Sequence, residues 1–159
     1  MRRYLGVAIV IVAVAAAWIT VLPSAPVRQP IAFPHANHRN VGCTVCHRGA
    51  ATTARAGIPD APLCAKCHAS PPGRSAAVWN AALGGRPIGW VQVTHVPDHV
   101  MFSHRRHVAL GRLDCASCHG KMAERRAPLG AAPLRLEMNT CLACHRREHA
   151  AEDCAACHR

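Results

Sequence analysis

The chain has 159 residues, with 19 Lys and Arg against 8 Asp and Glu, which gives a formal net charge of +11. It contains 10 Cys and 12 His but only 4 % aromatic residues, and Ala, Cys and one N-terminal apolar run supply much of its 50 % hydrophobic content. This composition argues against an enzyme domain closed around its own hydrophobic interior. It also argues against disorder, and it implies that disulfides, metals or large cofactors replace the missing core.

The N-terminus has the pattern of an export or anchoring segment. A basic start over residues 1–4 precedes 18 residues without a charge, 5–22, and then a Pro-containing linker over 23–30. About 20 apolar residues span a bilayer, whereas a signal-peptide core usually has about 7–15. We therefore expect a transmembrane helix over 5–22, with the rest of the chain on the periplasmic side because Arg2 and Arg3 stay inside. The alternative is cleavage near Ala15–Ala17, which would release a soluble periplasmic protein.

All ten cysteines fall in one repeated motif, C-x-x-C-H, the attachment signature of c-type haem. Two thiols one helical turn apart add to the vinyl groups of the porphyrin, and the adjacent His binds the iron as proximal ligand. The sequence therefore predicts five covalently attached haem c groups. The attachment residues are Cys43, Cys46, Cys64, Cys67, Cys115, Cys118, Cys141, Cys144, Cys154 and Cys157, and the proximal ligands are His47, His68, His119, His145 and His158.

Zinc sites and disulfides are the alternative explanations of paired cysteines. A Cys₄ zinc site needs two C-x-x-C pairs, so five pairs is an odd number for it, and zinc does not require a His after every second Cys. Disulfides suit an exported chain but leave the five histidines unexplained.

Five haems in about 130 residues would pack against one another and fill the interior. We expect a multihaem cytochrome c fold, mostly irregular, with short α-helices around stacked haems. Haem propionates also explain the excess of Arg, which binds carboxylates through paired hydrogen bonds. Basic residues are not interleaved with aromatic ones, so nucleic acid is not expected as a partner.

Seven further histidines are available as distal iron ligands. Four of them form two F-x-H-x-x-H blocks, 69 residues apart, at His35 and His38 and at His104 and His107. Histidines three residues apart lie on one face of a helical turn, too close to bind one iron but placed to bind two neighbouring irons. For the fifth distal ligand we favour His95, with His149 or His99 as alternatives. Methionine ligation, by Met101, Met122 or Met138, is a further alternative that would raise a haem potential.

The repeat of the blocks divides the chain into two modules. A two-haem module covers 31–72 and a three-haem module covers 91–159, joined by a linker over 73–90 with a short helix from Ser75 to Leu83.

The F-x-H-x-x-H block followed by C-x-x-C-H resembles the class III multihaem cytochromes c of the cytochrome c3 and c7 type. In that family the first His of the block serves the haem attached just downstream, which implies His35 for the haem of Cys43–His47 and His104 for the haem of Cys115–His119. The stretches 87–98, 102–107, 115–120 and 138–141 are similar to membrane-anchored pentahaem cytochromes, such as the pentahaem subunit of alternative complex III and molybdopterin-oxidoreductase-associated cytochromes.

These features predict an electron carrier, not an enzyme in its own right, in a respiratory chain with redox proteins as partners. Alternatively, the chain is the electron-transfer subunit of a quinol-oxidising or molybdopterin-type membrane complex. A third hypothesis is a multihaem reductase, which requires a haem with an open distal position.

Overall fold

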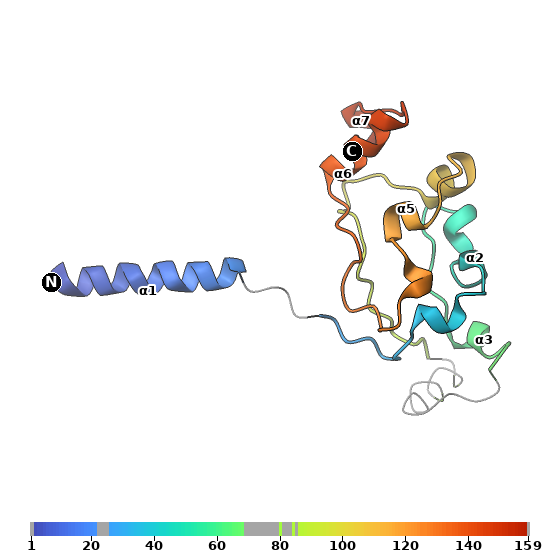
Figure 1. Ribbon diagram of the computed structural model, residues 1–159, viewed down its shortest axis with the longest axis horizontal. Helices are drawn as coiled ribbons and strands as arrows, with labels where there is room; N and C mark the ends of the chain where they lie inside the picture. The colour runs from blue at the N-terminus through green and yellow to red at the C-terminus, as the bar shows by residue number, and fades with distance from the viewer. Residues whose placement is uncertain (1, 22–25, 69–79, 81–83, 85, 159) are drawn as a thin grey trace.

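The computed structural model describes residues 2–21, 26–68, 80, 84 and 86–158 of the chain (Figure 1). The linker helix predicted from Ser75 to Leu83 falls almost wholly outside these residues.

Short helical turns joined by irregular segments make up the described chain after its first helix. In chain order the elements are α1 (Arg2–Val21), η1 (His35–His38), α2 (Cys43–Cys46), η2 (Arg48–Ala51), α3 (Ala61–Cys64), η4 (Arg105–Leu110, a π-helical turn), α5 (Ala116–His119), η5 (Met122–Glu124), α6 (Met138–Arg147) and α7 (Cys154–Cys157). Within this part of the chain the β-structure is one isolated antiparallel bridge between Val100 and His158. The expectation of short helices and little strand is confirmed.

The first helix, α1, lies apart from the helical turns in Figure 1, and its apolar side chains, such as Ile9 and Trp18, are exposed. Over the residues searched, which are the described ones, no helix has both the length and the apolar character that a membrane crossing requires. The structure therefore does not support the transmembrane helix predicted over residues 5–22.

The polypeptide buries very little of itself. Its accessible surface is 12492 Å², whereas a compact protein of 17.0 kDa exposes about 7,700 Å². Among the described residues only Ala50, Ala61 and Ile88 are buried hydrophobic side chains. The prediction of a chain without an ordinary core therefore agrees with the observed exposure.

Four segments, around Gln29, Asp60, Ile88 and Leu129, form a small hydrogen-bonded cluster that joins the two halves of the sequence. The Gln29 side chain donates to the carbonyls of Val91 (2.8 Å) and Leu129 (2.9 Å) and accepts from the Val91 amide. Asp60 Oδ1 accepts from the amides of Ala61 (2.9 Å) and Ile88 (3.0 Å). Ala61 and Ile88 form the buried centre of this cluster.

The loop after α2 holds the two halves together at a second place. Gly49 N donates to Ala56 O (2.9 Å), which closes the loop 49–57 on itself. Carbonyls of the closed loop then accept from the amides of His104 and Arg105, both at 3.0 Å. Element η2 thus lies against η4, more than 50 residues further along the chain.

Gly49→Ala tests whether this loop is needed. An added Cβ would collide with the carbonyl oxygen of Arg55 and would lie 2.7 Å from Thr53 Oγ1, so the loop would have to open. We expect a loss of about 1–3 kcal/mol in the free energy of unfolding, the usual cost of overpacking, measured by denaturant titration of the haem-loaded protein. Gly42→Ala is the matched control, because a Cβ there meets nothing within 4 Å. Equal stability of the two variants would contradict the assignment.

Candidate haem-binding site

Each C-x-x-C-H motif contains one helical turn. In four motifs the amide of the final His donates to the carbonyl of the first Cys, at 2.8 Å in 43–47, 3.0 Å in 64–68, 2.9 Å in 115–119 and 2.8 Å in 154–158, and the fifth motif, 141–145, lies within α6. Such short turns are not stable alone. Asp residues support three of them: Asp60 and Asp153 cap α3 and α7, and Asp114 accepts from Ala116 N.

Four of the five motif histidines face a second imidazole from elsewhere in the chain. The distances between ring centres are 6.3 Å for His104 and His119, 6.2 Å for His107 and His145, 6.0 Å for His38 and His68, and 5.5 Å for His99 and His158.

This spacing fits an iron held between two imidazoles. A metal with a ligating nitrogen about 2 Å away on either side separates the two ring centres by roughly 6 Å. The rings of His104 and His119 are also parallel to within 1°. The residues present therefore fit a haem with two axial histidines.

The pKa values of His35 and His119 are lowered from the ordinary value of histidine. Burial lowers the pKa of His35, and the proximity of His47 lowers it further. Burial also lowers the pKa of His119, with His104 and then His47 as the next causes. Lowered pKa values keep these imidazoles neutral near pH 7, and the neutral form is the one that binds a metal.

Backbone carbonyls orient several of the rings. Nδ1 of His47 lies 2.8 Å from Gly57 O, Nδ1 of His104 lies 3.0 Å from Ala54 O, and Nδ1 of His107 lies 2.9 Å from Ser103 O. Nδ1 of His145 makes a short contact with Ala151 O. An Nδ1–H that donates to a carbonyl leaves the lone pair of Nε2 free for a metal and fixes the orientation of the ring.

The two F-x-H-x-x-H blocks have the same geometry. Phe33 contacts His35 edge-on at 5.1 Å and stacks on His38 at 4.6 Å, and Phe102 repeats this with His104 at 5.0 Å and His107 at 4.6 Å. One phenyl ring thus contacts two imidazoles, edge-on to the first and stacked on the second, so the two imidazole planes differ in orientation. The role of these Phe residues was not predicted, although their place in the repeated block was a signal of it.

The three candidates for the fifth distal ligand differ in their surroundings. The rings of His99 and His158 are 5.5 Å apart and within 18° of parallel, and the antiparallel bridge between Val100 and His158, which includes Met101 N donating to Cys157 O at 2.8 Å, holds the segment there. All three histidines are exposed, and in the described structure neither His95 nor His149 has a ring contact with a motif histidine.

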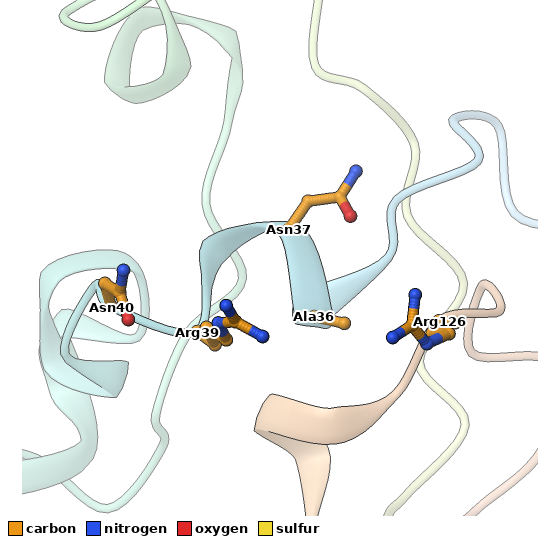
Figure 2. Close-up of a pocket in the computed structure, with 5 residues that line it drawn as sticks. All are labelled: Ala36, Asn37, Arg39, Asn40 and Arg126. Atoms are coloured by element: carbon orange, nitrogen blue, oxygen red, sulfur yellow. The ribbon is translucent and has the colours of Figure 1, made fainter.

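Two arginine side chains line a hollow of about 420 Å³ beside η1. Figure 2 shows Arg39 and Arg126 around Ala36, with Asn37 and Asn40 completing the lining. Arg125, the neighbour of Arg126, is half-buried, and its Nε has no hydrogen-bond partner among the described residues. Guanidinium groups placed this way can bind carboxylates, which agrees with the predicted role of Arg as a propionate partner.

All ten cysteine thiols are free in the structure. Over the described residues, no three His, Cys, Asp or Glu side chains gather into a group that could hold a metal ion by themselves.

Turns with two thiols and a histidine, faced by a second histidine, are the arrangement expected of c-type cytochromes with several haems. Two family models match the chain: residues 13–83 match the class III cytochrome c family, and residues 100–159 match cytochrome c7 and related cytochromes c. No curated protein sequence matches it. The two family matches support a multihaem cytochrome c similar to cytochromes c3 and c7, whose families bind haem c covalently, carry electrons and are typically periplasmic.

Phe102→Leu tests whether the phenyl ring orients both imidazoles of its block. Its contacts with His104 and His107 would be lost, and such ring contacts contribute about 0.5–1.5 kcal/mol each. We expect two of the low-spin ferric signals in electron paramagnetic resonance to shift, because these signals depend on ligand orientation. Leu110→Ala, at a side chain that is 63 % exposed at the end of the adjoining turn η4, is the control and should leave the spectrum unchanged. A Phe102→Leu spectrum identical to that of the control would contradict this role.

Proposed function

We propose that the chain is a pentahaem electron carrier in which every iron has two axial histidines. The observation that carries this proposal is the set of four imidazole pairs with ring centres 5.5–6.3 Å apart, each joining the His of one attachment motif to a spare His. Bound haem supplies one-electron iron redox chemistry, and the protein's contribution is to hold, space and orient the groups.

The proposed proximal ligands are the five motif histidines. The proposed distal ligands follow the ring contacts: His104 opposite His119, His107 opposite His145, His38 opposite His68 and His99 opposite His158. For His47 we propose His35, as the resemblance to the class III cytochromes implies, because His35 lies three residues before His38 on η1. We propose His99 in place of His95 as the fifth distal ligand, because among the three candidates His99 is the one with a recorded ring contact to a motif histidine in the described residues.

This ligand set argues for a carrier over a reductase. A reductase needs an open iron position with a pocket above it for the substrate. Here four motif histidines have a second imidazole at 5.5–6.3 Å, and with His35 proposed for His47 the set provides two protein ligands for each of five irons.

We further propose that the protein works on the periplasmic side of the cytoplasmic membrane. Support comes from the basic start and the charge-free run over residues 5–22 of the sequence. This segment would act as an anchor, or as an export signal if it is removed. Its partners would be redox proteins of a respiratory chain, including a quinol-oxidising or molybdopterin-type membrane complex. Isolation from membranes in mild detergent, followed by identification of the copurifying subunits, tests that part of the proposal.

The haem content has a direct test. The protein matured in a host that attaches haem c should have the mass of the chain plus five haem groups. All five irons should be low-spin in the ferric state and should bind no carbon monoxide when reduced. A mass with fewer haems, or a carbon monoxide complex in the unmodified protein, would contradict a carrier with five fully ligated irons.

His99→Ala distinguishes between the candidates for the fifth ligand. The haem should stay attached through Cys154 and Cys157, while one iron of the five becomes high-spin and binds carbon monoxide after reduction. His95→Ala and His149→Ala are matched controls and should remain fully low-spin. A high-spin iron in His95→Ala, together with an unchanged spectrum in His99→Ala, would overturn the assignment.

A further inference from the structure

The spatial order of the attachment motifs differs from their order in the sequence. In Figure 1 the motif-bearing helices follow one another as α3, α2, α5, α6 and α7, so α3 lies at one end and α2 lies between α3 and α5. The contacts that join each neighbouring pair can be followed one at a time.

The first link joins motif 64–68 to motif 43–47 through η1. His38 on this turn faces His68 at 6.0 Å between ring centres, and the turn leads directly into motif 43–47, with Val41 N donating to His38 O at 2.8 Å. A single helical turn thus reaches both motifs. Burial and then the Cys46 thiol raise the pKa of Cys64.

The second link joins motif 43–47 to motif 115–119. Motif 64–68, which lies between them in the sequence, is not part of this link. Nδ1 of His47 contacts Gly57 O at 2.8 Å, and the same loop contacts His104 through Ala54 O at 3.0 Å. His104 in turn faces His119. The attachment cysteines lie close as well: burial and then Cys43 raise the pKa of Cys115.

The third link joins motif 115–119 to motif 141–145 and repeats the first. His104 faces His119 and His107 faces His145, so one short turn again reaches two motifs. Burial raises the pKa of Cys118, with Cys144 and then Cys141 as the next causes.

The fourth link joins motif 141–145 to motif 154–158. The connecting loop folds back on α6 through Ala150 N donating to His145 O (2.8 Å) and through an ion pair of Arg146 with Glu152 (2.8 Å). The pKa of Cys141 is raised by burial and then by Cys157.

We propose that the five attachment motifs form one row in the order 64–68, 43–47, 115–119, 141–145 and 154–158, so that the second and fifth motifs of the sequence are its two ends. This inference rests on the proposed function, because the row orders haems only if each motif holds one. The first motif of the sequence is then an interior member that connects the two halves of the chain. External one-electron donors and acceptors would approach the ends, at α3 and at α7.

Contacts between protons of neighbouring haems test the order. In the fully reduced, diamagnetic protein, nuclear Overhauser cross-peaks between haem substituents report neighbours, and each haem is assigned through cross-peaks to its own two cysteines. We expect cross-peaks for four pairs of motifs: 64–68 with 43–47, 43–47 with 115–119, 115–119 with 141–145, and 141–145 with 154–158.

Cross-peaks between the haems of 64–68 and 115–119, with none between those of 43–47 and 115–119, would overturn the row. That result would leave the proposed function intact, because all five haems would still be present and assigned. The mass of the same sample tests the proposed function separately, since a haem count below five would refute the pentahaem carrier whatever the cross-peaks show.

Discussion

The interaction on which the rest of this structure depends is the approach of two imidazole rings from segments far apart in the sequence. His104 and His119 are parallel to within 1° at 6.3 Å, and three other pairs have similar spacing. A spacing of roughly 6 Å is wider than direct ring stacking requires, and it matches two nitrogens on opposite sides of one metal. The helical turns, the carbonyls that hold Nδ1 and the two Phe rings all act to maintain these pairs.

The weakness of the polypeptide core follows from the same arrangement. Among the described residues, three small or medium apolar side chains are buried, and the four ion pairs all lie at the surface, where such pairs contribute little to stability. Four-residue turns do not persist without tertiary support. In the proposed holoprotein, the porphyrins supply the apolar surface that a chain of this composition lacks. The Arg-rich hollow beside η1 would then hold charge of the opposite sign, from propionates.

Much of this architecture could be predicted from local sequence, because the residues that form each motif or block lie within six residues of one another. Each C-x-x-C-H motif forms its turn from adjacent residues, and each F-x-H-x-x-H block places its two histidines by helical spacing. The choice among His95, His99 and His149 depends on a different kind of contact. His99 faces His158 because Val100 and Met101 pair with the C-terminal motif, 56 or more residues away. The order of the motifs likewise depends on the loop carbonyls of Gly57 and Ala54, which no spacing rule predicts.

The most direct measurement compares the chain with and without attached haem. The protein would be produced in an exporting host that has, or lacks, the haem-attachment machinery, and the hydrodynamic radius and denaturant-induced unfolding of both forms would be recorded. The account predicts a compact, cooperatively unfolding holoprotein. It predicts an expanded apoprotein that unfolds without a cooperative transition, because its side chains cannot close a core. An apoprotein as compact and as cooperative as the holoprotein would contradict the claim that haem forms the interior.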